Sequence, residues 1–161
     1  MNATTIEQYW QNYLKTLSEE AVANQSYEAD QFGDTPELAN ELGQLVLDGR
    51  KTATCSALWE WEAEQSPLPE VGAKAIVLDS ENRPLCVIET TEVTVCTFDR
   101  VDAQFAYDEG EGDRSLESWR REHWQYFSRT LSEIGKVHTL DMPLVCERFR
   151  VVYRESLELD K

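Results

Sequence analysis

The sequence is poor in basic residues and histidine, and it has no long apolar run. It contains 15 Lys and Arg against 31 Asp and Glu, which gives a net charge of −16. Proteins that hold nucleic acid by its phosphates usually present a basic face, so this balance disfavours RNA or DNA as an extended ligand. A small neutral ligand meets no such repulsion. No apolar run approaches the roughly 20 residues needed to cross a bilayer, so we expect no membrane contact.

Cysteine is also too scattered to suggest a metal site. The four cysteines form no CxxC pair, and only two histidines accompany them. Structural zinc needs closely spaced Cys or His ligands, so we expect neither a metal nor another cofactor. Residues 1–5 lack the basic start and apolar stretch of a secretion signal, which predicts a cytoplasmic protein. In that reducing compartment disulfides are not expected. The cysteines are Cys55, Cys86, Cys96 and Cys146.

Three helices are predicted from apolar residues at helical spacing. The first begins after Thr4 or Thr5, and the second begins at Pro36 after the cap Thr35 and stops near Gly49. The third follows Ser115, and we expect its inward-facing residues to be buried. These are Leu116, Trp119, His123, Phe127, Leu131 and Ile134.

Strands are predicted for residues 73–78, 85–95 and 144–153, with a hairpin connection at 80–84. Residues 51–55 read as a strand or a taut loop, and residues 24–34 as a polar linker. Asp99 is placed to cap a short helix through Phe105. The order predicts an α+β fold in which one curled antiparallel or mixed sheet is flanked by helices. We expect one domain over residues 1–161, with residues 1–30 as an N-terminal helical extension.

Cationic and hydroxyl side chains cluster directly after the second predicted helix. Gly49-Arg50-Lys51-Thr52 is not a P-loop, because that motif needs GxxxxGK[ST] between a strand and a helix. In an extended segment alternate residues share a face, so Arg50, Thr52 and Thr54 would project together and Lys51 would point away unless the chain turns. A solvated basic helix end is the simpler alternative. The candidate binding groups are Arg50, Lys51, Thr52, Thr54 and Ser56.

An acidic loop at residues 108–113 is the second candidate. Its two glycines give the backbone freedom to aim a carboxylate inward, although a solvated loop or a weak cation site stays open. The spacing does not match an EF-hand. His123 lies between Trp119 and Phe127 on an apolar helix face, which favours a buried structural histidine.

Several short motifs in this order resemble the ASCH family of small PUA-like β-barrel domains. The resemblance runs from Phe32 to Tyr153 and implies a PUA-like barrel with a cleft lined by the GRKT segment. Short bacterial members are amidohydrolases that cleave N4-acylated cytidines with a lysine, a threonine and a glutamate, which match Lys51, Thr54 and Glu109 here. The motifs are LDGRKTATC (47–55), PEVG (69–72), FAYDEGEGD (105–113), WRREH (119–123) and VCERF (145–149).

The chemistry of this triad is reasonable by itself. A threonine hydroxyl needs a base as it attacks, and Lys51 could serve if burial lowers its pKa from about 10.4, with the neighbouring Arg50 acting in the same direction. Glu109 would orient Lys51 or pass a proton to the leaving amine. Together with this chemistry, the resemblance implies an amidohydrolase that cleaves the N4-acyl amide of a modified cytidine-type nucleoside. The expected substrate-binding residues are Arg50, Thr52, Ser56, Trp59, Asp113 and His123.

Two other functions fit the same residues. One is a PUA-like module that binds RNA or a nucleotide through Arg50 and Lys51 without chemistry. The other is a metal-independent ribonuclease that uses Lys51 and His123. The acidic charge favours the nucleoside over RNA. The sequence leaves the oligomeric state and the acyl group open.

Overall fold

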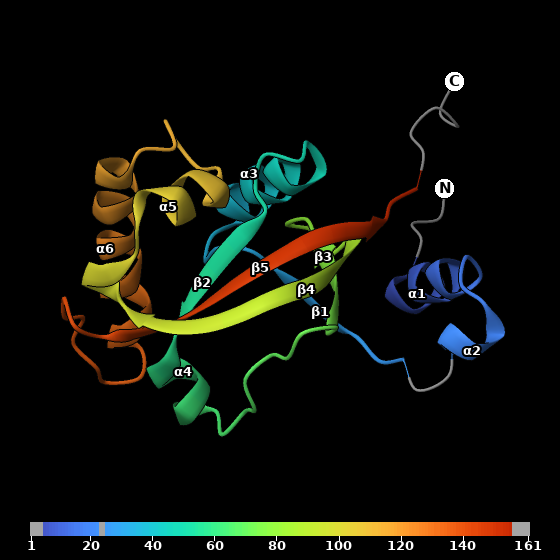
Figure 1. Ribbon diagram of the computed structural model, residues 1–161, viewed down its shortest axis with the longest axis horizontal. Coiled ribbons are helices and arrows are strands. Elements are labelled where there is room, and N and C mark those ends of the chain that lie inside the picture. The colour runs from blue at the N-terminus through green and yellow to red at the C-terminus, as the bar shows by residue number, and fades with distance from the viewer. Residues whose placement is uncertain (1–4, 23–24, 156–161) are drawn as a thin grey trace.

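A twisted five-stranded sheet forms the centre of the protein, for which a computed structural model describes residues 5–22 and 25–155 (Figure 1). The strand order is β1-β3-β4-β5-β2; β1 pairs with β3 in parallel, and the other three pairings are antiparallel. The expected curled mixed sheet flanked by helices is thereby confirmed. The strands are β1 (Glu28–Gln31), β2 (Ala53–Ala57), β3 (Lys74–Leu78), β4 (Pro84–Thr97) and β5 (Pro143–Tyr153).

The helices begin largely where side-chain caps were predicted. Thr5, Thr35 and Ser115 each accept a hydrogen bond from the backbone N–H three residues later, which satisfies one of the free donors of a helix start. Thr4, the alternative first cap, lies outside the described residues. The helical elements are α1 (Ile6–Leu14), α2 (Glu19–Val22), α3 (Pro36–Leu47), α4 (Leu58–Ala63), η1 (Phe98–Arg100), α5 (Ala103–Glu109) and α6 (Leu116–Ser132).

Two local predictions need correction, and one helix was not predicted. The supposed polar linker contains β1, a short polar edge strand that forms because it pairs with β3 rather than because of its own pattern. Asp102, not Asp99, caps the short helix: its carboxylate accepts the Phe105 N–H at 2.9 Å, while Asp99 belongs to a 3-10 turn. Residues 58–63, which carry no clear pattern, form helix α4.

The helices α5 and α6 cover one end of the sheet (Figure 1). Trp119, Phe127 and Leu131 of α6 are buried with Phe98 and with residues of β2 and β5. Leu116 and Ile134, which we expected to be buried, are only partly so, because Leu116 begins the helix and Ile134 lies beyond its last residue, Ser132. At other places on the sheet, α1 packs against Ile76 and Val87 in a separate cluster.

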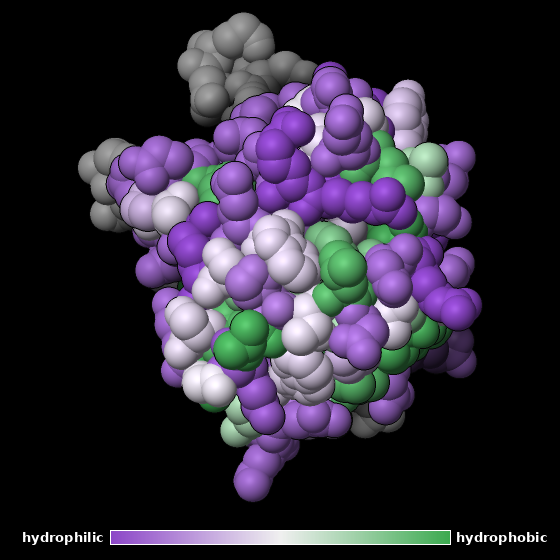
Figure 2. Space-filling model, turned by 90° about the vertical axis from the view of Figure 1, so that its left-hand side faces the viewer, coloured by the Kyte–Doolittle hydropathy of each residue, from purple (hydrophilic) through white to green (hydrophobic). Residues whose placement is uncertain are grey.

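The surface on the α5 and α6 side is mainly hydrophilic, with separate apolar patches (Figure 2). Within residues 5–22 and 25–155, no helix is long and apolar enough to cross a membrane.

Candidate active site

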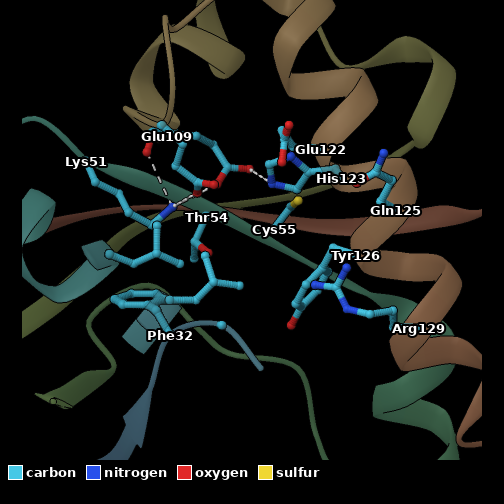
Figure 3. A pocket seen from close by; sticks show the side chains of 14 residues that line it. Phe32, Lys51, Thr54, Cys55, Glu109, Glu122, His123, Gln125, Tyr126 and Arg129 are labelled. Carbon is cyan, nitrogen blue, oxygen red and sulfur yellow. Dashed lines mark hydrogen bonds and ion pairs between the residues drawn. The ribbon is translucent and has the colours of Figure 1, made fainter. Parts of the chain in front are cut away.

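A cavity of about 110 Å³ opens between β2, the segment after β1, α3 and α6 (Figure 3). It contains both buried charged groups and aromatic rings. Its lining residues are Phe32, Gly33, Leu38, Leu42, Lys51, Thr54, Cys55, Glu109, Glu111, Glu122, His123, Gln125, Tyr126 and Arg129.

The chain turns sharply after α3, and this turn sends Lys51 inward. Gly49 has a positive φ of 77°, and the N–H groups of Arg50 and Lys51 both donate to the Leu45 carbonyl, at 3.0 and 3.1 Å. Lys51 is consequently 1% exposed, whereas Arg50 and Thr52 are exposed. Lys51 and Thr54 thus line the same cavity. In a fully extended segment, their side chains would have pointed to opposite faces.

Glu109 reaches the cavity from the last residue of α5. The helix ends at Gly110 with φ 78°, and a Cβ at this position would collide with the Arg50 carbonyl. The Arg50 guanidinium in turn donates to the Gly110 carbonyl at 3.2 Å. The acidic loop and the segment after α3 are therefore held together, and Glu109 is 1% exposed beside Lys51.

The Lys51 ammonium is surrounded by oxygen atoms. Nζ donates to Glu109 Oε1 at 2.8 Å, Glu111 Oε2 at 2.9 Å and the Ala53 carbonyl at 2.9 Å. Burial would lower the pKa of Lys51, but the carboxylates of Glu109 and Glu111 outweigh it and raise the pKa above its ordinary value. The condition that burial and Arg50 together lower the pKa of Lys51 is therefore not met.

The Glu109 carboxylate contacts three other side chains of the site. Besides Lys51 on Oε1, its Oε2 accepts the Trp119 indole N–H at 2.9 Å and lies 3.5 Å from His123 Nε2. Burial would raise the pKa of Glu109, but Lys51 and His123 dominate and hold it well below its usual range. Lys51 and Glu109 are thus a buried charged pair.

His123 combines two arrangements that we had treated as alternatives. Its ring stacks on Trp119 with centroids 4.3 Å apart, and Nδ1 lies 2.9 Å from the Trp119 carbonyl. Its other nitrogen faces Glu109 in the cavity. Burial would lower the pKa of His123, but the Glu109 carboxylate raises it above its ordinary value. The histidine is both packed and part of the cavity wall.

The other predicted binding residues do not line this cavity. Arg50 holds the acidic loop, and the Thr52 N–H donates to the Asp108 carbonyl at 2.8 Å. Ser56 accepts the Trp61 indole N–H at 2.8 Å, and Trp59 packs against the core. Asp113 accepts two hydrogen bonds from Ser115 at the start of α6. Their contacts are structural, and their role in binding stays a prediction.

Sequence reasoning missed the contribution of α6 to the cavity. Glu122, Gln125, Tyr126 and Arg129 border it beside His123, and Arg129 makes a paired hydrogen bond to Asp34 at 3.0 and 3.1 Å. Residues 122, 126 and 129 recur at helical spacing and form a polar stripe beside the apolar face. This pattern could have indicated that α6 borders a polar cavity. Phe32 carried no comparable signal.

The fold and this cavity define a PUA-like domain, and comparisons with known proteins agree. A family model described as "ASCH domain" matches residues 28–153. The ASCH domain of Lactobacillus crispatus JV V101 is 36% identical with a TM-score of 0.88, over 92% of this chain and 94% of that one. A protein of Enterococcus faecalis V583 is 36% identical with a TM-score of 0.86, over 97% and 93%. The comparison with curated proteins gives no match.

The chain therefore belongs to the ASCH domain family.

Proposed function

We propose that this protein is an amidohydrolase that removes the N4-acyl group from a modified cytidine-type nucleoside. The observation that carries the proposal is the buried pair of Lys51 and Glu109, joined at 2.8 Å in a cavity that Thr54 also lines. These are the positions that the resemblance to N4-acylcytidine amidohydrolases matches with a catalytic lysine, threonine and glutamate.

The proposed reaction uses the Thr54 hydroxyl as nucleophile. Its oxygen attacks the acyl carbonyl carbon while its proton passes to the neutral Lys51 amine. The carbon–N4 bond then breaks, N4 takes up the proton that Lys51 has just accepted, and the acyl group remains as a threonine ester. Water hydrolyses that ester to the free acid and restores the hydroxyl. Glu109 orients Lys51 throughout.

Lys51 must first give up one of its present contacts. Its three N–H donors are taken by Glu109, Glu111 and the Ala53 carbonyl. Glu111 is the most displaceable partner, because it is 23% exposed and lies between two glycines with positive φ. Substrate entry that displaces Glu111 would free Lys51 to act on Thr54.

The size of the cavity favours a small group. About 110 Å³ is less than the roughly 300–1,000 Å³ typical of sites that enclose a whole drug-sized ligand. The acylated amide and the adjacent base edge would enter, and the sugar would stay toward solvent. Phe32 and Tyr126 supply aromatic surface beside this volume.

The burial of Lys51 weighs against the alternative of an RNA- or nucleotide-binding module. At 1% exposure, and with its donors occupied, its ammonium does not face solvent as a phosphate-binding group would. The net charge of −16 points in the same direction. The ribonuclease alternative keeps one supporting observation, since Lys51 and His123 border the same cavity.

Single-turnover hydrolysis of N4-acetylcytidine tests the proposal. Thr54→Ala removes the nucleophile, and Lys51→Arg replaces a tunable amine with a group that stays protonated, so each should lower turnover by at least about 10²–10⁴-fold. Thr94→Ala is the matched control, because this threonine is exposed on β4 and does not line the cavity.

Ligand binding measured in parallel separates chemistry from affinity. Thr54→Ala should bind nearly as well as wild type. Full turnover by Thr54→Ala would refute the nucleophile assignment. If the wild type hydrolyses no acylated cytidine but cleaves RNA, the amidohydrolase proposal is refuted and the ribonuclease alternative is supported.

A further inference from the structure

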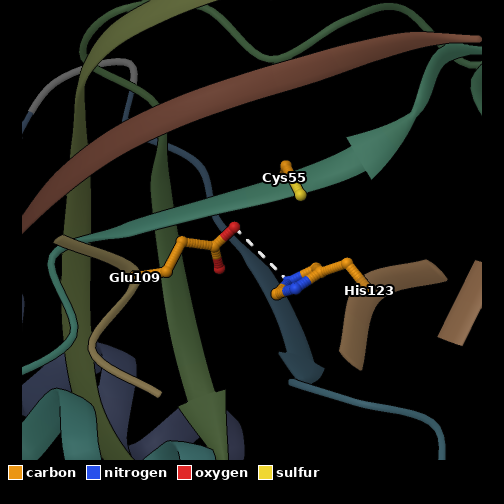
Figure 4. Close-up of side chains that lie close together, drawn as sticks. All are labelled: Cys55, Glu109 and His123. Carbon is orange, nitrogen blue, oxygen red and sulfur yellow. Dashed lines mark ion pairs between the residues drawn. The ribbon is translucent and has the colours of Figure 1, made fainter. Parts of the chain in front are cut away.

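Three side chains of different chemistry meet on one wall of the cavity (Figure 4). Cys55 comes from β2, Glu109 from the end of α5 and His123 from α6. The thiol sulfur, one carboxylate oxygen and one ring nitrogen all lie within 4.8 Å of one another. The proposed hydrolysis does not use Cys55 or the His123 ring, so their convergence needs a separate explanation.

The backbone contact of His123 selects its tautomer. A carbonyl oxygen only accepts, so the Nδ1 atom 2.9 Å from the Trp119 carbonyl must carry a hydrogen. The lone pair of a neutral ring then lies on Nε2, which faces Glu109 Oε2 at 3.5 Å. Histidines that bind metal commonly donate their other ring N–H to a carbonyl or carboxylate in this way. Stacking on Trp119 further restrains the ring.

Glu109, like His123, is held in place by hydrogen bonds from neighbouring residues. Trp119 donates its indole N–H to Oε2 at 2.9 Å, and Lys51 binds Oε1 at 2.8 Å. A carboxylate offers about four lone-pair sites, so Oε2 can accept the indole and still bind a cation. Lys51 sits on the other oxygen, and Glu111 at 2.9 Å offsets part of its charge.

We propose that Cys55 Sγ, Glu109 Oε2 and His123 Nε2 form a binding site for one zinc ion. A thiolate, an imidazole and a carboxylate together suit zinc, whereas Mg²⁺ and Ca²⁺ prefer oxygen ligands alone. Tetrahedral zinc places its ligand atoms about 3.3–3.6 Å apart, which the 3.5 Å between Nε2 and Oε2 already matches. Three protein ligands would leave a fourth position for water, and all three residues line the cavity together with Thr54.

Metal binding would change the protonation of the ligands. Burial and the Glu109 carboxylate raise the pKa of the Cys55 thiol, so the metal-free residue is uncharged at neutral pH. Zinc takes the place of the thiol proton and of any proton on Nε2. Zinc adds two positive charges and loss of the Cys55 thiol proton removes one, so the site gains one positive charge; loss of a proton from Nε2 would cancel that gain as well.

Cobalt titration of the full chain tests the site without any substrate, so its failure is distinct from a failure of the proposed hydrolysis. We expect one Co²⁺ per chain, a thiolate-to-cobalt charge-transfer band in the near ultraviolet, and displacement of cobalt by one equivalent of zinc. Cys55→Ser should abolish the band. His123→Gln should weaken zinc binding at least 10–100-fold, about the loss that even outer-shell changes cause.

Cys96→Ser and His138→Gln are the matched controls, because neither residue lines the cavity. Both should bind zinc as wild type does. A band that persists in Cys55→Ser, or one that Cys96→Ser removes equally, would overturn the proposal. If a variant fails to fold, zinc-edge X-ray absorption of the wild type decides the question: one sulfur ligand supports the site, and none or several reject it.

Discussion

Replacing Glu111 with glutamine should make the proposed hydrolase faster at neutral pH. The substitution removes one of two carboxylates that bind the Lys51 ammonium, and it keeps an oxygen that can accept a hydrogen bond at the same place. Glu111 helps to raise the pKa of Lys51, so loss of its charge must lower that pKa. More of Lys51 is then the neutral amine that can accept the Thr54 proton.

The size of the effect follows from the 2.9 Å between Nζ and Oε2. Coulomb's law gives about 1.4 kcal/mol for unit charges at this separation in water, and about 6 kcal/mol at an effective dielectric constant of 20. These energies correspond to about 1 and 4 pKa units. Glu111 is 23% exposed, so we take the lower value as the minimum. Below the pKa of Lys51, kcat/KM should therefore rise at least about tenfold.

The assay is the pH dependence of kcat/KM for N4-acetylcytidine in buffer that contains a chelator. The rising limb should move to lower pH in Glu111→Gln, because kcat/KM reports the free enzyme. Glu122→Gln is the matched control: it removes a carboxylate that also borders the cavity but pairs with Arg121 at 3.7 Å. An unshifted profile with equal or lower turnover in Glu111→Gln would refute Lys51 as the base.

Three further predictions concern the fold around the site. Phe127→Ala should lower the free energy of unfolding by about 3–5 kcal/mol in denaturant titrations, because Phe127 is fully buried. Gly110→Ala should lower Tm and turnover, since it adds a collision with the Arg50 carbonyl to the roughly 1–2 kcal/mol of positive-φ strain, whereas Gly135→Ala in open space should show the strain alone. Burial raises the pKa of Cys86 to about 12, so alkylation at pH 8 should be at least about 10³-fold slower than in the unfolded chain.

Local sequence signals predicted the parts of the fold that depend on local chemistry. The caps Thr5, Thr35 and Ser115 could be found because each is a short side chain placed directly before an apolar periodic segment. β1 could not be found this way, because its four mostly polar residues become a strand only by pairing with β3. The expectation of one domain over the whole chain stays a prediction.

The candidate site was likewise predicted only in part. The GRKT segment and the acidic loop indicated Lys51, Thr54 and Glu109, which the structure brings to one cavity. The direction of the Lys51 pKa could not be predicted, because it depends on how closely Glu109 and Glu111 approach Nζ, and sequence spacing does not contain those distances. The α6 wall was missed because His123 was weighed alone, without its polar neighbours along the helix.

Glu109 connects the two proposals and leads to a last prediction. In the hydrolase its carboxylate orients Lys51, and in the zinc site the same carboxylate binds the metal through Oε2. A dication beside Lys51 favours the neutral amine, but the metal and its fourth ligand would also fill part of a cavity of only about 110 Å³.

We expect exclusion of the substrate to dominate, so zinc should inhibit turnover. The measurement is hydrolysis of N4-acetylcytidine during a zinc titration, followed by addition of a chelator, which should restore the initial rate. His123→Gln should require at least about tenfold more zinc for the same inhibition, because it loses a ligand without losing Lys51 or Thr54. Acceleration by zinc would contradict the exclusion argument and would mean that the metal takes part in the reaction.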